Sequence, residues 1–409
     1  MPLLKRCPLT IRQRTSLPGL CAFVFVLLFS VAVVTPVVPL YASSLGASWT
    51  EIGLMGTSYG TTAMLLALVS GKISDRLGRK PLLLGSATLG ALAALLYLVT
   101  GAVWQLIAVR ILEGVAWAFF WPAVEAVATE IVEPIKAGRA MGMVTASYGI
   151  AFASGSLVGG SIVDIMGFAQ TFASYLGLSV VSVLAALYFL HETRPQKPQH
   201  VAHGSENDVS SSMQRSETLL LAYFLGGTYT FGLGIVLSLF SVFAKNLGVA
   251  LVLIGVLFGI FWLGRIIGSF EVGRLCDRYG RKPFATAGMT GSALGFALVA
   301  ASTRMELLLV AVAVLGVSLG ALFPTSIALI SDSVHQSKRG YAMGIFETAC
   351  AAGFMLASTF GGYLADLYSP RTPYVLATIT SVASAVILSW KLRESKTLLP
   401  SRHELSTAA

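Results

Sequence analysis

The chain has 409 residues, of which 55% are hydrophobic and only 11% are charged. A soluble domain carries roughly 25% charged residues, so this composition excludes a protein whose main solvent is water. The net charge is +9. Its distribution along the chain indicates orientation in a membrane and excludes a general nucleic-acid-binding surface.

Apolar runs of membrane-spanning length follow one another along the whole chain. A helix of about 20 residues crosses the ~30 Å hydrocarbon layer. The runs are apolar on every face, which excludes the alternating strands of a transmembrane barrel. We therefore predict an all-α integral membrane protein of twelve transmembrane helices. In the first half the predicted spans cover about 17–42, 52–70, 82–100, 103–128, 141–163 and 169–190. In the second half they cover about 219–243, 249–270, 284–302, 307–329, 341–364 and 373–391.

The basic residues predict the orientation of these spans, because Lys and Arg in short loops stay in the cytoplasm. All but five of the 28 Lys and Arg residues fall on the side that holds both termini. The first run is followed by a second span, so we expect a retained helix and no cleaved signal. The sequence thus predicts a multi-pass protein of the plasma (inner) membrane with both termini cytoplasmic. The five exceptions are Lys245, Arg304 and Arg371 on the other side and Arg110 and Arg265 within spans.

The chain resembles itself at a constant offset of 202 residues. Residues 78–81 (Gly-Arg-Lys-Pro) fall on residues 280–283, and such coincidences continue from residue 45 to residue 164. Chance matches would scatter over many offsets, so this pattern indicates a duplicated six-helix unit. Because six is even, the two copies form parallel repeats. The expected organisation is an N-terminal half of residues 1–190, a cytoplasmic linker of 191–216, a C-terminal half of 217–392 and a cytoplasmic tail of 393–409.

The loop after the second span carries the same pattern in both halves. It reads Gly-Lys-Ile-Ser-Asp-Arg-Leu-Gly-Arg-Lys at 71–80 and Gly-Arg-Leu-Cys-Asp-Arg-Tyr-Gly-Arg-Lys at 273–282. Its glycines permit a close helix approach and a tight turn, and its basic residues hold it at the anionic membrane surface. A carboxylate such as Asp75 at the membrane boundary needs a partner, which Arg79 or a helix N-terminus would supply.

This pattern resembles the loop motif of the major facilitator superfamily, and the resemblance covers nearly the whole chain. The resemblance implies the major facilitator fold and a charge relay of Asp75, Arg79 and Glu130, repeated in the second half. The alternative is that both loops only fix the topology. The residues predicted to form the cytoplasmic gate are Gly71, Asp75, Arg76, Gly78, Arg79, Glu130, Gly273, Asp277, Arg278, Gly280, Arg281 and Asp332.

The fourth span carries Arg110-Ile-Leu-Glu113-Gly114, which resembles the Arg-x-x-x-Gly motif of proton-coupled members of the superfamily. On a helix these charges share a stripe about 140° wide with Glu125 and several aromatic residues. Lipid would penalise the charges, so we expect the stripe to line a water-filled cavity. Glu113 or Glu125 would then bind a proton. The alternative is a static ion pair between Arg110 and Glu113.

Three further features of the spans are site candidates. Glu347 in the eleventh span is a candidate proton or cation site, or a plain ion-pair partner. Gly155, Gly159 and Gly160 in the fifth span resemble the glycine-rich antiporter motif, in which Ser156 replaces the usual proline, and they also suit helix packing. Aromatic side chains would suit flat apolar or cationic molecules, although such residues also pack between helices. The predicted substrate cavity comprises Trp117, Phe120, Trp121, Tyr148, Trp262, Arg265 and Phe346.

The function that this pattern favours is a secondary active transporter, an antiporter that exports amphipathic small molecules in exchange for protons by alternating access. The alternatives are a proton symporter or facilitator for a polar metabolite, and a non-transporting membrane receptor. The chain has no Walker loop or catalytic constellation, so we expect no enzyme, no cofactor and no metal site. The expected partners are a small-molecule substrate, protons and the lipid bilayer. We expect a monomer that binds no nucleic acid.

Overall fold

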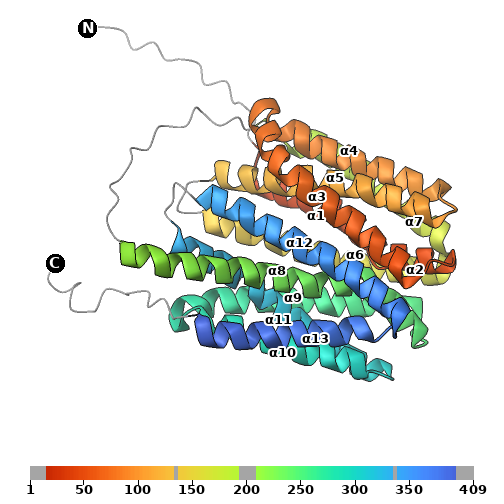
Figure 1. Ribbon diagram of the computed structural model, residues 1–409. Coiled ribbons are helices and arrows are strands. Elements are labelled where there is room, and N and C mark those ends of the chain that lie inside the picture. Colours follow the sequence, from red (N-terminus) through yellow and green to blue (C-terminus); the bar gives the residue numbers. More distant parts are fainter. Residues whose placement is uncertain (1–14, 133–136, 193–208, 335–338, 393–409) are drawn as a thin grey trace, which may run out of the picture.

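The computed structural model describes residues 15–132, 137–192, 209–334 and 339–392, although a few side chains within these ranges are not described. These ranges contain thirteen helices and no strand (Figure 1). The helices are α1 Leu17–Val34, α2 Val37–Ser44, α3 Trp49–Leu77, α4 Arg79–Val99, α5 Val103–Glu130, α6 Ala137–Met166, α7 Phe168–Phe189, α8 Val209–Asn246, α9 Leu251–Tyr279, α10 Lys282–Ala301, α11 Met305–Ser333, α12 Arg339–Leu367 and α13 Thr372–Lys391.

The helices α1 and α2 form one membrane span, Leu17–Ser44, which is interrupted at Pro36. Proline has no backbone N–H, so it breaks the hydrogen-bond ladder of the helix at this point. Within the described residues, eleven segments including this one are long and apolar enough to cross a membrane. Helix α3, with 29 residues, packs among them. The prediction of twelve transmembrane helices is therefore confirmed.

Several helices continue beyond the predicted apolar spans into segments that carry charged residues. Helices α3 and α9 run to Leu77 and Tyr279, and each is followed by a glycine with positive φ, 102° at Gly78 and 90° at Gly280. Glycine adopts this backbone conformation without steric cost, so it ends both helices at the same place in the repeat. Helix α8 begins at Val209, inside the segment predicted as linker.

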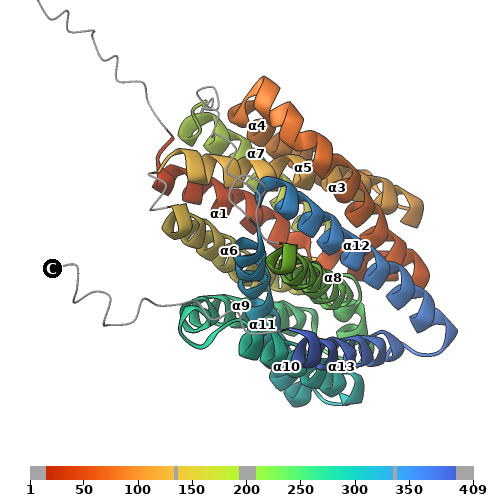
Figure 2. The same ribbon diagram turned by 60° about the vertical axis from the view of Figure 1, so that its left-hand side comes forward.

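The two halves pack their helices in the same pattern. The contacts α3–α5, α1–α6 and α4–α7 of the first half recur as α9–α11, α8–α12 and α10–α13 in the second. The halves meet along α3–α12 and α6–α9, which are also related by the repeat. The warm-coloured and cool-coloured halves lie side by side with their helices roughly parallel (Figures 1 and 2). This arrangement confirms two parallel six-helix repeats.

One end of the bundle holds the start of α1 and the end of α13, and we name it the terminal end (Figure 1). At the opposite end the halves are in close contact. Asp366 of α12 accepts hydrogen bonds from the backbone N–H groups of Trp49 (3.0 Å) and Thr50 (2.7 Å) of α3. Thr57 and Thr359 are hydrogen-bonded through their hydroxyls at 2.7 Å. These contacts close the opposite end along α3 and α12.

Glycines bring the backbones together at both junctions between the halves. A Cβ added to Gly255 would lie 2.7 Å from the carbonyl oxygen of Ser156 and 2.9 Å from the Cα of Gly160. The repeat-related pair is Gly53 and Gly362, where an added Cβ would also overlap backbone atoms. Side chains are absent from these contact points because glycine has none, so the helix axes approach closely. We name these two glycine contacts the paired seals.

The other glycines predicted for helix packing lie against the first span. A Cβ on Gly155 would lie 2.7 Å from the carbonyl oxygen of Phe29, and one on Gly159 would overlap the carbonyl of Val33. Ser156 between them is fully buried, and its hydroxyl donates to the carbonyl of Ala32 at 3.4 Å. The glycine face of α6 therefore packs on α1 and, through Gly160, on α9.

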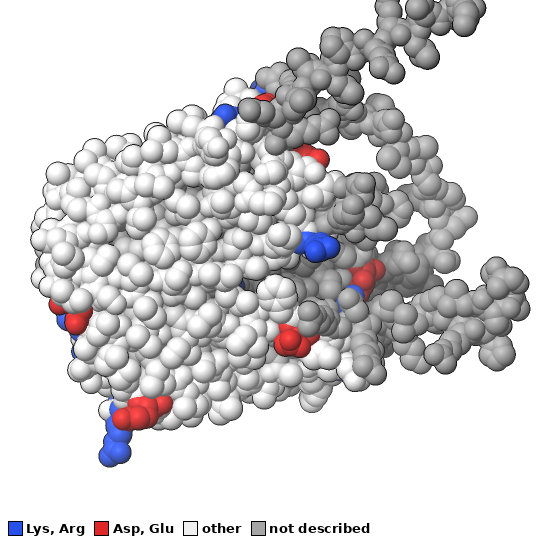
Figure 3. All heavy atoms as spheres, turned by 180° about the vertical axis from the view of Figure 1, so that it is seen from behind, with Lys and Arg blue, Asp and Glu red and all other residues white. Residues whose placement is uncertain are grey.

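The outer surface suits lipid. Figure 3 shows one face of the molecule on which Lys, Arg, Asp and Glu gather near the two ends and leave the band between them largely uncharged. Exposed side chains on the long helices are large and apolar, for example Leu65 (61% exposed), Val310 (54%) and Ile379 (60%). Such a surface is stable in the hydrocarbon layer of a bilayer.

Candidate functional site

A cavity of about 670 Å³ lies between the two halves. Its walls come from helices α1 and α3 to α7 on one side and from α8, α9, α11 and α12 on the other. Along α12 the lining begins at Met343, close to the terminal end, and stops at Phe354, well before the seal residue Gly362. The cavity therefore occupies the middle of the bundle and the part nearer the terminal end, and the seals close it from the opposite end.

An ion pair on α5 lies in the wall of the first half. The Nη1 atom of Arg110 donates to Oε2 of Glu113 at 2.7 Å. The hydroxyls of Tyr97 (3.1 Å) and Tyr175 (3.4 Å) donate to the same carboxylate, from α4 and α7. The Arg110 guanidinium also lies 5.4 Å from the ring centroid of Tyr59. Both oxygens of Glu113, which is 8% exposed, thus have donors, and three helices are joined around it.

Two more carboxyl groups line the cavity nearer the terminal end. Glu125 is on α5 and Glu347 is on α12, so they belong to different halves. The two groups are close enough to interact electrostatically. Within the described part of the chain, neither forms an ion pair with a basic side chain. The cavity therefore has two acidic groups, one on each half, without a fixed counter-ion.

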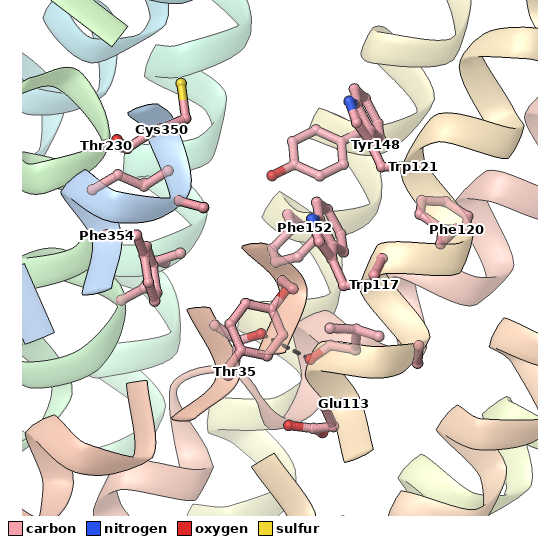
Figure 4. A pocket seen from close by; sticks show the side chains of 18 of the residues that line it. Thr35, Glu113, Trp117, Phe120, Trp121, Tyr148, Phe152, Thr230, Cys350 and Phe354 are labelled. Carbon is pink, nitrogen blue, oxygen red and sulfur yellow. Dashed lines mark hydrogen bonds between the residues drawn. The ribbon is translucent and has the colours of Figure 1, made fainter. Parts of the chain in front are cut away.

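Aromatic side chains of both halves line the cavity, and Figure 4 shows Trp117, Trp121 and Tyr148 on one side of it and Phe354 on the other. Trp117 and Trp121 of α5 are stacked with their planes 2° apart and centroids 5.9 Å apart. Tyr148 of α6 lies 5.8 Å from Trp121 and 5.1 Å from Trp262 of α9. Phe152 approaches Trp262 to 4.4 Å. This wall is flat and apolar, which suits aromatic ligands.

Arg265 of α9 faces the same cavity from the second half. Its guanidinium lies 4.6 Å from the ring centroid of Trp262, and Nη2 donates to the hydroxyl of Tyr229 on α8. Its Nη1 atom is buried and has no hydrogen-bond partner among the described residues, and the same holds for Nε1 of Trp262. Both donors belong to residues that line the cavity.

One predicted cavity residue lies elsewhere. Phe346 does not line the cavity, since its ring is fully buried 6.1 Å from the Phe323 ring and against Gly226 of α8. The neighbouring Glu347 turns toward the cavity instead. Phe120 is 1% exposed and reaches the cavity wall only in part, with its ring 6.3 Å from Phe23. Successive residues on a helix point 100° apart, so adjacent positions separate into packing and lining roles.

The charged loops form equivalent ion pairs in both halves. Arg79 pairs with Glu130 at 3.0 Å, and Arg281 pairs with Asp332 at 3.2 Å. In both ion pairs the arginine Nε atom donates to the carboxylate at 3.2 Å, so the two halves share the geometry of this pair as well as its sequence. Arg76 is exposed. For five further predicted gate residues the structure describes only the helical backbone, namely Gly71, Asp75, Gly273, Asp277 and Arg278.

Sequence reasoning missed Glu192 and the two tyrosines that donate hydrogen bonds to Glu113. Oε1 of Glu192 accepts a hydrogen bond from the backbone N–H of Arg79 at 2.8 Å and covers the N-terminus of α4. The signal was present in the repeat, because Glu394 follows Glu192 by the same 202 residues. Tyr97 and Tyr175 carry hydroxyls inside apolar spans, where such a group needs a partner. Among the described residues, no three His, Cys, Asp or Glu side chains come together as a metal site would require.

Comparison with known proteins places the chain in one family. The model of the Major Facilitator Superfamily matches residues 20–242 and 219–406. Multidrug resistance protein 2 of Bacillus subtilis is 23% identical over 94% of this chain and 97% of its own length. The class C tetracycline resistance protein of Escherichia coli is 26% identical over 71% of this chain and 74% of its own.

A solved structure agrees on the fold. The crystal structure of the nucleoside transporter NupG superposes with a TM-score of 0.72 at 15% sequence identity and covers 92% of this chain and 99% of that one. The matched proteins are transporters and not enzymes. Together with the repeated six-helix halves and the cavity between them, these matches show that the chain is a multi-pass membrane transporter of the Major Facilitator Superfamily.

Proposed function

We propose that this transporter exports amphipathic small molecules across the plasma membrane in exchange for protons, by alternating access. In this proposal both termini, the linker of residues 191–216 and the tail of 393–409 are cytoplasmic, as the excess of basic residues favours. The terminal end then faces the cytoplasm. In this proposal the protein acts as a monomer.

The asymmetry of the two ends supports alternating access. The paired seals close the opposite end, while the cavity extends toward the terminal end. In the proposed topology this is an inward-facing conformation that receives substrate from the cytoplasm. The Arg79–Glu130 and Arg281–Asp332 pairs brace the terminal end of each half, and the halves rock about the site at the middle of the membrane.

The observation that carries proton coupling is the pair of carboxyl groups on opposite halves, Glu125 and Glu347. Two carboxylates without counter-ions repel each other and oppose closure of the terminal end. A proton on one of them removes this repulsion and allows a hydrogen bond between the halves, so proton binding changes the balance between the two conformations. Glu113 has three hydrogen-bond donors and serves in this scheme to hold α4, α5 and α7 together.

The cavity wall and the relatives support the class of cargo. The stacked rings of Trp117 and Trp121 and the Tyr148–Trp262 contact provide flat apolar surfaces. Relatives that match most of the chain are named for multidrug resistance and tetracycline resistance. An exporter of amphipathic molecules fits both observations, whereas a symporter for a sugar or a small polar organic acid would need more uncharged hydrogen-bonding side chains in the wall.

The test uses everted vesicles with an imposed proton gradient and a pH-sensitive dye, to which lipophilic compounds, sugars and organic acids are added. We expect lipophilic compounds to dissipate the gradient in the wild type and in Glu306→Gln, a control on an exposed residue at the opposite end. Glu125→Gln and Glu347→Gln should abolish this response. Substrate uptake in the wild type without proton movement would refute coupling and favour a facilitator. Retained coupling in both cavity variants would refute the assignment of these two carboxyl groups.

A further inference from the structure

The positive charges in the cavity wall differ in how they are neutralised. Arg110 is paired with Glu113 at 2.7 Å. Arg265 has no carboxylate within 4.0 Å among the described residues, and its hydrogen-bond partner is the uncharged hydroxyl of Tyr229. A cation inside a membrane protein normally has an anionic partner, because an unpaired charge in low dielectric is costly. The second half therefore presents a positive charge without a protein counter-ion at the middle of the transport pathway.

The donors beside this charge point to a ligand with acceptor oxygens. Nη1 of Arg265 and Nε1 of Trp262 are both buried and both without a partner among the described residues. Trp262 is 1% exposed and packs against Tyr148, Phe152 and the guanidinium itself, so its position is fixed. Buried donors that stay unpaired cost free energy. A carboxylate has two acceptor oxygens, and a guanidinium and an indole N–H from residues one helical turn apart could each donate to one of them.

The surroundings of the guanidinium define the rest of the ligand. The ring of Trp262 covers one side at 4.6 Å, and Phe261 and Tyr229 approach it at 5.9 and 5.5 Å. The aromatic wall that crosses to Trp121 continues from Trp262 by way of Tyr148. A molecule with its charge at Arg265 would therefore place its remaining part against flat apolar rings.

We infer that the transported molecule is an aromatic or other flat apolar carboxylate, and that Arg265 binds its carboxylate with Trp262 as a second donor. The inference rests on the proposed function, because it names the class of molecule carried. Nη2 of Arg265 donates to the hydroxyl of Tyr229, so Nη1 of the same guanidinium remains as the donor for the ligand. The acidic groups Glu125 and Glu347 lie nearer the terminal end, so the ligand neutralises Arg265 without replacing either of them.

The test is direct binding to the purified full chain in lipid nanodiscs by isothermal titration calorimetry, without a proton gradient. The probes share one ring system and differ in charge: naphthalene-2-carboxylate, naphthalene-2-carboxamide and a naphthylmethyl-trimethylammonium ion. In the wild type we expect the carboxylate to bind about ten times more tightly than the carboxamide, or better, which is the usual effect of a charge-assisted hydrogen bond. Arg265→Gln should remove this preference and leave carboxamide binding within about twofold.

Two further variants separate the charge from the fold. Arg265→Lys should keep part of the preference, and Arg304→Gln, an exposed arginine at the opposite end, should keep all of it. Equal binding of carboxylate and carboxamide in the wild type, preference for the ammonium ion, or no binding of any probe would overturn the inference. So would a preference that persists in Arg265→Gln. A carboxylate preference that appears only in Glu347→Gln would also overturn it, because Arg265 would then serve Glu347.

The outcome is separable from that of the proposed function. If the carboxylate binds at Arg265 but no compound moves protons in vesicles, the proposal of proton-coupled transport is refuted and the binding site is supported. If lipophilic cations discharge the gradient while the carboxylate binds no better than the carboxamide, the transport proposal is supported and the inferred substrate class is refuted.

Discussion

The seal between α6 and α9 offers a sharp test of what holds this conformation. In Gly255→Ala the new Cβ would lie 2.7 Å from the carbonyl oxygen of Ser156 and 2.9 Å from the Cα of Gly160. The first distance is about 0.7 Å shorter than an ordinary van der Waals contact near 3.4 Å, and both neighbours are backbone atoms that cannot rotate away. Overpacking of this kind costs about 1 to 3 kcal/mol. The cost applies only while the opposite end is closed, so the substitution should favour the conformation in which that end opens.

The control is Gly85→Ala in α4, where an added Cβ meets no atom within 4 Å. Both substitutions replace glycine inside a helix and gain about the same helix propensity, roughly 1 kcal/mol. Their difference therefore isolates the contact at the seal.

The assay follows a single cysteine in the cavity, Thr348→Cys, in a chain whose native cysteines are replaced. A membrane-impermeant maleimide is added to the terminal-end side of the membrane. A bias of 1 to 3 kcal/mol changes a two-state equilibrium about five- to 150-fold. From equal populations in the wild type, a fivefold change lowers the fraction open to the terminal end from one half to about one sixth. Labelling should then be about threefold slower in Gly255→Ala and unchanged in Gly85→Ala. Unchanged labelling of a folded Gly255→Ala protein would refute the reasoning that the glycine contact maintains closure.

Five further substitutions test the tyrosine hydrogen bonds to Glu113, the two loop ion pairs and Gly78, each by thermal unfolding in detergent. Tyr97→Phe should lower stability by about 1.5 to 3 kcal/mol, because its hydroxyl donates to a buried carboxylate at 3.1 Å, and Tyr175→Phe should cost less because its bond is 3.4 Å long. Equal effects would contradict this ranking. Glu130→Gln should be more destabilising than Asp332→Asn, since the Glu130 pair is the more buried and exposed ion pairs contribute about 0 to 1 kcal/mol; the reverse order would contradict it. Gly78→Ala should cost about 1 to 2 kcal/mol, because φ is 102° there, and an unchanged melting temperature would show that the turn tolerates a side chain.

The sequence predicts the membrane spans well, because lipid leaves the backbone no partner except its own helix. Long apolar runs therefore specify helices almost regardless of their neighbours. The start of α8 at Val209 was not predicted. The segment before the apolar run is polar, so the requirement to span the membrane does not specify its helical structure. The repeat offset and the ion pairs Arg79–Glu130 and Arg281–Asp332 follow from the same duplicated pattern.

The cavity is less predictable from sequence than the spans. The stripe of Arg110, Glu113 and Glu125 on α5 lines one cavity, as charge in an apolar helix requires. The position of Phe346 depends instead on how α12 is rotated against α8, which no single-helix pattern specifies. The tyrosine partners of Glu113 come from α4 and α7, so they depend on tertiary packing.

The paired seals have a mechanical consequence. Each seal is a contact between the backbones of two glycines, Gly53 with Gly362 and Gly160 with Gly255. No side chains interlock at these glycines, so none must move before the helices can separate there. Because the repeat relates the two contacts, they lie on either side of a common axis and can separate together. The opposite end can therefore open by a rigid tilt of the two halves about the middle of the membrane, without any rearrangement of side chains at the seals.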